Sequence, residues 1–366
     1  MAFLSLETGN YRNLKAGAID TGASFVFFVG ENGQGKSNIL DALYTICYGS
    51  SFRRGTDADS SRIGSRDWFI KATIGPLDGN DQSSGSLLDT MVVSWDARTK
   101  TIRENGKAIS DRKYLVEKYP AIVFCHEDMD FVSGEPERRR FFFDQTIGLV
   151  KNSYIDSLRN YKKCLKMKNA ALKEHMFDVL DAIDVQLITY GLELQRFRND
   201  LMAGFNETFT LCYNKISAYD RVVQIAYRPS WKSYDFGEVS VNLASGRERE
   251  IMLGTNLSGP HRDRFYFMDE EGDFSLRAST GQRRLMSLVL RIAQAEYYVR
   301  ETGNKPILLL DDVLLELDPE KRKRFMQYLP PARQAFFTFL PGEPFKDYLN
   351  HDTIVYWTDD GHFLRT

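Results

Sequence analysis

Gly30-Glu31-Asn32-Gly33-Gln34-Gly35-Lys36-Ser37 is the stretch that decides the fold. It has the spacing of a phosphate-binding loop: a glycine, four residues and then Gly-Lys-Ser. The short apolar run at 24–29 predicts a buried strand before it, and residues 38–44 carry apolar side chains at helical spacing after it. Strand, loop and helix start together aim backbone N–H groups and a helix dipole at phosphate. A chance glycine-rich turn would not have this context, so we expect a bound nucleoside triphosphate.

Each residue type in the loop has an expected role. Gly33 and Gly35 allow backbone dihedrals that other residues avoid, and they leave no side chain to block a phosphate. Lys36 places a positive charge at the β- and γ-phosphates, and Ser37 offers its hydroxyl to Mg²⁺. The loop therefore predicts a triphosphate held together with Mg²⁺.

Composition limits the class of protein. The 366 residues are 43% hydrophobic and 27% charged, which is typical of a globular chain. No apolar run approaches the length of a membrane span, and the first residues lack the layout of a signal peptide. The four cysteines form neither a metal spacing nor a disulfide framework. We expect a cytoplasmic protein without a membrane partner, and the net charge of −2 neither favours nor excludes nucleic acid.

The segment after the loop is predicted to be β-rich. Strand-like runs at 68–74 and 90–95 flank a polar insert at 75–85, which has the composition of a flexible hairpin tip. Asn105-Gly106 is a strong hairpin signal. We therefore expect a β-rich subdomain over 68–110 instead of another crossover helix.

A helical arm is predicted farther along the chain. Apolar and aromatic residues recur at heptad spacing in two stretches, and two such seams joined by a short turn make an antiparallel helix pair. The seam positions are Tyr154, Leu158, Tyr161, Leu165 and Leu172, followed by Leu180, Ile183, Leu187, Tyr190, Leu194, Phe197 and Leu201.

Two basic features accompany the arm. Arg138, Arg139 and Arg140 open a helix where cations oppose the dipole, so either a partner anion holds them or they form a solvated turn. The cations of the first arm helix either contact phosphates or form a solvated face, which is the commoner case. These cations are Lys151, Arg159, Lys162, Lys163, Lys166, Lys168 and Lys173. The candidate DNA contacts are Arg138, Arg139, Lys162, Lys163 and Lys166.

A second group of motifs lies near the C-terminus. Ser279-Thr280-Gly281-Gln282 begins a helix and could by itself be an N-cap. The aliphatic run at 306–310 ends in Asp311 and Asp312, as in a Walker B strand whose carboxylates meet Mg²⁺ and water. Glu316-Leu317-Asp318-Pro319 follows it. In this order, and together with the phosphate loop, the motifs resemble those of ABC-type ATPases. The long separation between the loop and Ser279 excludes a close relative of the transporter subunits.

More specifically, the chain resembles the bacterial RecF family of recombinational repair proteins along nearly its whole length. The segments that carry the resemblance are Asn10-Tyr11-Arg12-Asn13-Leu14, Gly30 to Asn38, Phe124-Cys125-His126-Glu127-Asp128, Gly134 with Pro136, Arg138-Arg139-Arg140-Phe141, Phe143-Asp144, Gly259-Pro260-His261-Arg262-Asp263, Ser279 to Arg284, and Leu309-Leu310-Asp311-Asp312-Val313. The resemblance implies an SMC-like head that forms a homodimer when ATP is sandwiched between two copies. It also implies binding to gapped DNA or single-strand/duplex junctions, and work with RecO and RecR to load RecA.

The resemblance assigns roles position by position. Lys36 and Ser37 match the Walker A pair, Asp311 the Mg²⁺-associated acid, and Asp312 the acid that polarises the attacking water. Ser279, Gly281 and Gln282 match the signature that contacts the γ-phosphate held by the other subunit. The expected catalytic residues are Lys36, Asp311, Asp312 and Gln282, with Mg²⁺ at Ser37 and Asp311, partly through water. The expected ATP contacts are Arg12, Gly30, Asn32, Gly33, Gly35, Lys36, Ser37, Asn38, Ser279, Gly281 and Gln282.

Three positions depart from the family pattern. Arg264 stands where the family usually places another acid after Gly-Pro-His-Arg-Asp, and Cys125 stands where many members carry proline. Thr338 occupies the switch position after the last core strand, where ABC transporters use histidine. A slower or differently gated hydrolysis would fit this last departure.

We therefore predict an α/β fold: an ABC/SMC-like ATPase head with a β-rich subdomain and an inserted antiparallel helical arm. The head is expected over 1–134 and 246–366, and the arm over 135–245. The predicted function is a slow, Mg-dependent ATPase that works as an ATP-gated DNA clamp in repair. The alternatives are an SMC-like chromosome protein, for which the arm is short, and the ATPase subunit of a membrane transporter.

Overall fold

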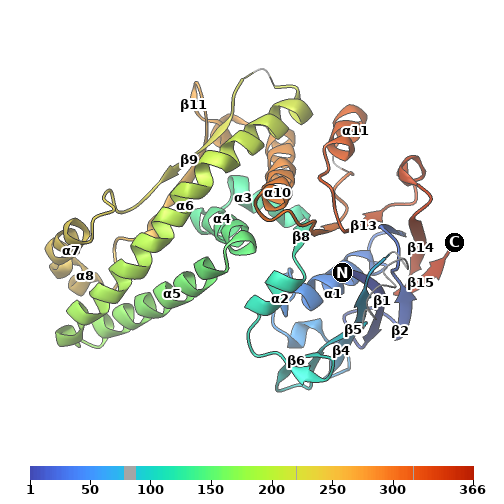
Figure 1. Ribbon diagram of the computed structural model, residues 1–366, viewed down its shortest axis with the longest axis horizontal. Coiled ribbons are helices and arrows are strands. Elements are labelled where there is room, and N and C mark those ends of the chain that lie inside the picture. The colour runs from blue at the N-terminus through green and yellow to red at the C-terminus, as the bar shows by residue number, and fades with distance from the viewer. Residues whose placement is uncertain (78–87, 220, 316) are drawn as a thin grey trace. The chain divides into compact units, whose positions relative to one another are not determined.

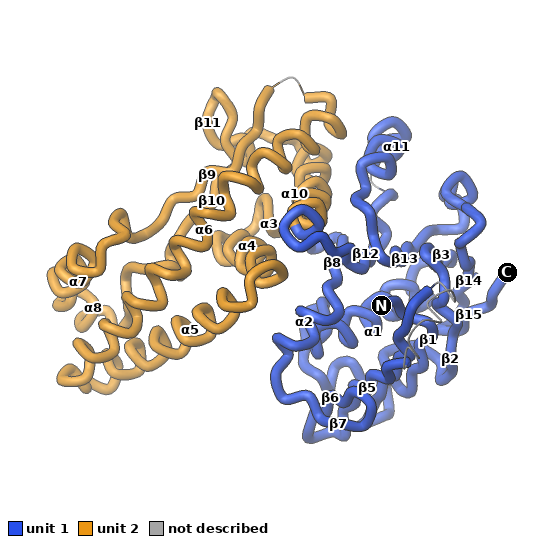
Figure 2. Tube along the Cα trace, viewed as in Figure 1, with its two compact units in different colours: residues 1–127, 298–366 blue, residues 128–297 orange. Residues whose placement is uncertain are grey.

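The computed structural model describes residues 1–77, 88–219, 221–315 and 317–366 (Figure 1). These residues divide into two compact units, 1–127 with 298–366 and 128–297 (Figure 2). Within the described ranges, no helix combines the length and the apolar character that a bilayer span requires.

The first unit is built on a sheet of six strands in the order β15-β14-β3-β13-β12-β8. Its five strands from β14 to β8 run parallel, and β15 pairs with β14 as an antiparallel edge. Strands β3, β8 and β12 are almost wholly apolar and buried, because both faces of a parallel sheet are covered. The bounds are β3 Phe25–Val29, β8 Ala121–Phe124, β12 Ile307–Leu310, β13 Gln334–Phe339, β14 Thr353–Asp359 and β15 His362–Arg365.

A second, antiparallel sheet of the same unit has the order β2-β1-β4-β5-β6-β7. The predicted β-rich segment supplies β4 to β7, and the hairpin at Asn105 and Gly106 has the positive φ values, 50° and 79°, that its turn requires. The predicted hairpin tip at 75–85 lies mostly outside the described residues. The bounds are β1 Ala2–Gly9, β2 Gly17–Asp20, β4 Trp68–Gly75, β5 Asp89–Trp95, β6 Lys100–Glu104 and β7 Lys107–Ala108.

One hydrophobic core joins the two sheets through helix α1, Lys36–Tyr48. Leu40 and Leu43 of α1 share this core with Val26 of the parallel sheet and Ile70 of the antiparallel sheet. The helix that begins at the phosphate loop is thus anchored from both sides. Helices α2 Lys113–Lys118 and α11 Pro319–Gln327 complete the regular helices of the unit.

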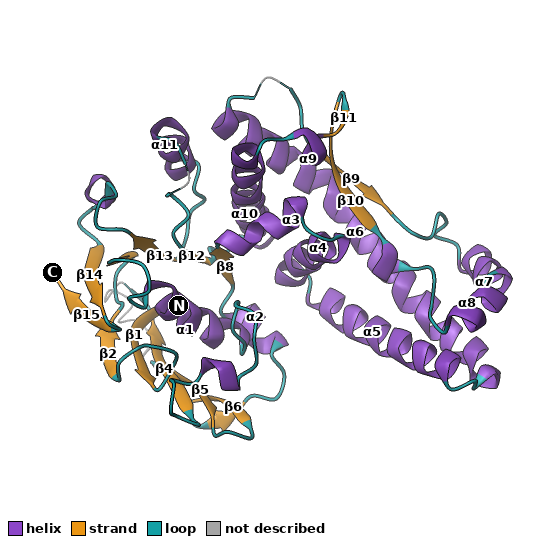
Figure 3. Ribbon diagram, turned by 180° about the vertical axis from the view of Figure 1, so that it is seen from behind, coloured by secondary structure: helices purple, strands orange, loops and turns teal. Residues whose placement is uncertain are grey.

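The second unit is mainly helical (Figure 3). Its long helices α5 and α6 form the predicted antiparallel pair, and β9, β10 and β11 form a small antiparallel sheet beside α6. The helices are α3 Asp130–Ser133, α4 Pro136–Val150, α5 Asn152–Lys173, α6 Leu180–Ser217, α7 Phe236–Ser245, α8 Arg247–Leu253, α9 Phe274–Arg277 and α10 Thr280–Thr302. The strands are β9 Gln224–Arg228, β10 Arg264–Asp269 and β11 Gly272–Asp273.

The seam between α5 and α6 differs from the predicted one. On α5, the buried positions include Ser157, Cys164 and Lys168, whereas Leu158 and Leu165 are only half-buried. Lys168 is fully buried because the carboxylates of Asp184 and Glu250 lie 2.8 Å from its Nζ atom, so it does not belong to the expected basic face.

The unit boundaries also differ from the predicted domain limits. Residues 246–297, which the sequence suggested for the head, lie in the same unit as the arm. The cause is long-range pairing: β10 hydrogen-bonds along β9, and Phe265 of β10 stacks on Phe143 of α4 with ring centroids 4.1 Å apart.

Candidate nucleotide site

The phosphate loop connects the buried end of β3 to the start of α1. Gly33 and Gly35 have φ values of 81° and 111°, a region that favours glycine. At Gly30, an added Cβ would lie 2.4 Å from the carbonyl oxygen of Thr358, so only glycine fits between the neighbouring strands. The backbone therefore has the shape that the motif predicted.

A pocket of about 150 Å³ lies over this loop. It is lined by Glu31, Asn32, Gly33, Gly35, Lys36, Ser37, Asn38, Arg53 and Asp312. Most of the expected nucleotide contacts are thus brought together, and all of the lining residues belong to the first unit. Gly30 and Arg12 are not part of the lining.

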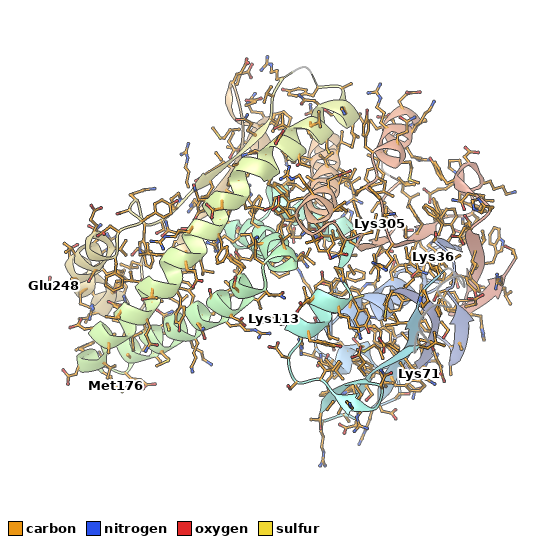
Figure 4. All side chains as sticks on the ribbon, viewed as in Figure 1. Lys36, Lys71, Lys113, Met176, Glu248 and Lys305 are labelled. Atoms are coloured by element: carbon orange, nitrogen blue, oxygen red, sulfur yellow. The ribbon has the colours of Figure 1, made fainter. Side chains whose placement is uncertain are left out.

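Lys36, which is labelled in Figure 4, is one of the residues that line this pocket. It is 3% exposed, and its Nζ donates to the carbonyl oxygens of Gly30 at 2.6 Å and Glu31 at 3.1 Å. An oxygen of the Asp312 carboxylate lies 4.0 Å from the same Nζ atom. Among the described residues, the ammonium group therefore has only neutral acceptors at hydrogen-bond distance, and an anion entering the pocket can take their place.

The acids that follow β12 meet the loop that follows β3, although β13 lies between these two strands in the sheet. Ser37 hydrogen-bonds to Asp311, and burial raises the pKa of Asp311 to about 6, with the negative charge of Asp312 acting in the same direction. Asp312 has a left-handed backbone with φ 48°. Its carboxylate accepts a 2.8 Å hydrogen bond from the Thr338 hydroxyl. Thr338, at the switch position, thus holds Asp312, the acid to which the resemblance assigns water activation.

A chain of amide contacts connects the loop to residues that the site prediction omitted. Asn13 donates to the carbonyl oxygen of Gly33 at 2.9 Å, and Asn38 donates to the Asn13 side chain at 2.6 Å. Arg53 donates to Asn38 at 2.8 Å, which brings its guanidinium to the pocket. Residues 50–55 form a polar segment with two arginines, Arg53 and Arg54, and nothing in the local sequence distinguishes Arg53 from its neighbour.

Arg12 is held behind this chain by a buried carboxylate. Its Nε donates to Asp41 at 2.7 Å, and Asp41 also accepts from the hydroxyls of Tyr11 at 2.7 Å and Ser51 at 2.8 Å. Although burial opposes the charge, the Asp41 carboxylate raises the pKa of Arg12. Arg12 is therefore a permanent cation fixed to α1 and to the loop that carries Arg53.

The residues of the Ser-x-Gly-Gln motif lie at the start of α10 in the second unit. Ser279 and Gln282 form a reciprocal capping box: each backbone N–H donates to the other side chain, at 2.8 and 3.2 Å. Ser279 and Gly281 are exposed and Gln282 is half-exposed. The motif is thus an N-cap within one copy, and it remains open to a ligand brought from outside.

The candidate DNA contacts fall into two groups. Lys162, Lys163 and Lys166 are exposed on α5. Arg139 instead donates to the carbonyl oxygens of Phe265 and Val132, at 3.0 and 2.7 Å. Arg138 lies 3.5 Å from Asp130. The lysines have solvated ammonium groups, whereas the arginines already have internal partners.

The donor atoms present fit Mg²⁺. The Ser37 hydroxyl and the Asp311 carboxylate are hard oxygen ligands of the kind that Mg²⁺ takes beside nucleotide phosphates. Within the described residues, no cluster of three or more His, Cys, Asp or Glu side chains could form a metal cage. This agrees with a Mg²⁺ site in which the protein supplies few ligands, and phosphate oxygens and water molecules supply the others.

Comparisons with known proteins identify the family. The family model described as "RecF/RecN/SMC N terminal domain" matches residues 3–344. The "DNA replication and repair protein RecF" of Treponema pallidum (strain Nichols) is 42% identical over 354 residues, which are 96% of this chain and 98% of that protein. The protein of the same name from Leptospira interrogans (serovar Lai, strain 56601) is 30% identical over 346 residues, 94% of this chain and 93% of that protein.

A solved structure described as "recombination mediator protein RecF-ATP in RecFOR pathway" has the same fold. Its TM-score is 0.87 at 23% identity, with 100% of this chain and 97% of that chain covered. Family model, full-length relatives and fold agree: this chain belongs to the RecF family, among the proteins that share the RecF/RecN/SMC N-terminal domain.

Proposed function

We propose that this chain is an ATP-dependent DNA-binding protein of replication and recombinational repair, and that it works as an ATP-gated dimer. The pocket that joins the phosphate loop to Asp312 carries the nucleotide part of the proposal. The names of the full-length relatives support the role in DNA replication and repair. In this proposal, slow ATP hydrolysis acts as a conformational switch.

The residues of the pocket divide the chemistry among them. The loop N–H groups and Lys36 bind phosphate oxygens, and Asn38 with Arg53 closes the side of the pocket. Asp312, held by Thr338, orients a water molecule and accepts its proton. Ser37 and Asp311 would hold Mg²⁺, which neutralises phosphate charge when bound. Positioning and charge neutralisation supply most of the catalysis in such a site.

The dimer follows from how the motifs are divided. We infer that Ser279, Gly281 and Gln282 of a second copy close over the nucleotide that one copy cradles. Their exposure at the start of α10 and the restriction of the pocket lining to the first unit support this arrangement. ATP would then hold two copies together, and hydrolysis would release them.

DNA binding is assigned to the arm. The exposed lysines Lys162, Lys163 and Lys166 fit a phosphate backbone. Gapped DNA or a single-strand/duplex junction is the proposed substrate, with RecO and RecR as partners in loading RecA in the cytoplasm. The RecFOR pathway named for the structural neighbour supports these partners.

Binding to single-stranded, duplex and gapped DNA, with and without ATP and Mg²⁺, tests the proposal. We expect ATP-dependent retention on gapped DNA that weakens steeply with salt. Replacing Lys162, Lys163 and Lys166 by alanine should weaken binding and make the salt dependence less steep by about one unit per lost phosphate contact. The control replaces Lys107, Lys305 and Lys346, three exposed lysines of the first unit. Wild-type protein that ignores DNA under all nucleotide conditions would refute the function.

A further inference from the structure

The small sheet of the second unit presents an unusual pair of arginines. In the antiparallel pairing of β9 and β10, Arg264 lies directly opposite Arg228. Side chains alternate along the strands: Phe265 and Phe267 are buried on the inner face, whereas Arg264 and Arg228 are exposed on the outer face. Two long cations therefore stand side by side on one surface.

This pairing is unfavourable unless something neutralises it. Like charges directly opposite each other on adjacent strands repel. Neither arginine forms an ion pair with a carboxylate in the described part of the chain. The guanidinium carbon of Arg228 lies 5.0 Å from the ring centroid of Tyr266, which neighbours it diagonally on the same face. This ring orients one guanidinium but does not cancel its charge.

Other arginines next to the same sheet are neutralised. Arg277 forms ion pairs with Asp269 and Glu271, and Arg221 also pairs with Glu271. Asp269 and Glu271, at the β10–β11 end, are thus taken by these two cations. Next to β10, burial lowers the pKa of Arg139; the carboxylate of Asp273 acts against this effect, whereas the charge of Arg264 adds to it. The Arg228–Arg264 pair stands in a locally positive environment.

We propose that the Arg228–Arg264 pair binds a phosphate group of a DNA backbone. A phosphate offers several oxygens to two guanidinium forks at once, whereas a single carboxylate suits one fork. Tyr266 adds a ring beside the cations, a combination found on surfaces that track single strands. The assignment rests on the proposed DNA-binding function. It adds a surface separate from the α5 lysines, because α6 lies between α5 and the β9–β10 pair (Figures 1 and 3).

The test compares two double variants in the full-length protein with ATP and Mg²⁺. Arg228→Ala/Arg264→Ala removes the unpaired cations, and Arg221→Ala/Arg277→Ala removes the same number of cations that already have carboxylate partners. We expect the first variant to bind gapped DNA several-fold more weakly, with a salt slope lower by about one unit. Its Tm should equal or exceed that of the wild type, because repulsion between the strands is relieved. The control should keep the DNA affinity and salt slope of the wild type.

The outcomes distinguish a failure of the Arg228–Arg264 surface from a failure of the proposed DNA-binding function on which it rests. Wild-type protein that does not bind DNA refutes the proposed function itself. Wild-type binding with an unchanged salt slope in Arg228→Ala/Arg264→Ala overturns the arginine surface alone. Poly-glutamate binding that needs this pair, while DNA binding does not, would assign the surface to an acidic protein partner and also overturn the proposal. A lower Tm in the first variant would contradict the argument from repulsion, and Arg264→Gln then tests the salt slope with less loss of packing.

Discussion

Two buried lysines, one in each unit, show how this chain separates structure from function. Lys36 in the first unit is 3% exposed and Lys168 in the second is 0% exposed. Lys168 has two carboxylate oxygens at 2.8 Å, from Asp184 and Glu250. In the part of the chain that the structure describes, Lys36 has only two backbone carbonyls at hydrogen-bond distance, and the carboxylate of Asp312 lies 4.0 Å away.

The difference in partners explains what each lysine can do. A buried ammonium group between two carboxylates is neutralised within the fold, and it holds α5, α6 and α8 together. An ammonium group held by neutral acceptors at a pocket keeps its charge available for an incoming anion. Burial alone therefore does not distinguish a structural lysine from a ligand-binding one; the chemistry of its neighbours does.

The largest expected effect is on Lys168. Lys168→Ala leaves Glu250 buried without its cation and leaves Asp184 with Arg247 alone, so we expect a loss of about 3–5 kcal/mol in the free energy of unfolding. Urea denaturation followed by circular dichroism measures this loss. Adding Glu250→Gln to a Lys168→Met variant removes the orphaned charge, keeps the Arg247–Asp184 ion pair and should restore most of the stability. A fully stable Lys168→Ala protein would contradict the comparison.

Lys36→Ala should have the opposite profile. The two carbonyls that it leaves are next to a solvent-accessible pocket, so we expect a much smaller change in stability than for Lys168→Ala. ATP affinity should fall by about 10- to 150-fold, the value of a charge-assisted hydrogen bond. Titration calorimetry checks this, with Lys305→Ala as an exposed control in the same unit. Unchanged ATP affinity would show that the pocket is not the nucleotide site.

A smaller effect is expected from pH. Burial, together with the charge of Asp312, raises the pKa of Asp311 from 3.8 to about 6. Only the ionised carboxylate attracts Mg²⁺, so Mg-dependent ATP binding should weaken below about pH 6, approaching tenfold per unit. Asp311→Asn should bind weakly at every pH, without this inflection.

The raised pKa of Asp311 affects folding stability in the opposite direction to Mg²⁺ binding, and this difference provides a control. Because the pKa of Asp311 is higher in the folded state than in the unfolded state, the folded protein binds more protons between pH 3.8 and about 6. Ionised Asp311 thus destabilises the fold above this range, and acid relieves the cost. At mildly acidic pH, we expect weaker Mg-dependent ATP binding, whereas the contribution of Asp311 to stability should be unchanged or higher. The two results together would show that the loss of binding is not caused by unfolding.

The parts of the fold that depend on local sequence were predictable. The phosphate loop could be identified because its backbone dihedrals require glycines at fixed positions. The strand before Asp311 could be identified because a strand buried on both faces is a continuous apolar run. The seam of α5 was predicted wrongly in detail because Ser157, Cys164 and Lys168 occupy buried positions that an apolar pattern does not reveal. From the sequence alone, Lys168 is expected to be solvated, because its partners Asp184 and Glu250 are distant along the chain.

The rest required the folded chain. Asn13 reaches the phosphate loop, and Arg53 reaches the pocket, only because the segment after β1, α1 and the loop after α1 come together. No spacing in the sequence predicts this. The unit limits depend on the pairing of β9 with β10, which is equally non-local. The signature at Ser279 was predicted as a motif, and its proposed role requires a second copy of the chain.

The mass of the Asp312→Asn protein in solution tests the gated dimer most directly. This substitution removes the proposed base but keeps Lys36 and Ser37, so ATP should bind and persist. Light scattering after size exclusion should give a monomer near 42.1 kDa without ATP and twice that mass with ATP and Mg²⁺. A second substitution, Ser279→Arg, should return the ATP-bound protein to a monomer. A monomer under both conditions for Asp312→Asn, with ATP shown to be bound, would contradict the account.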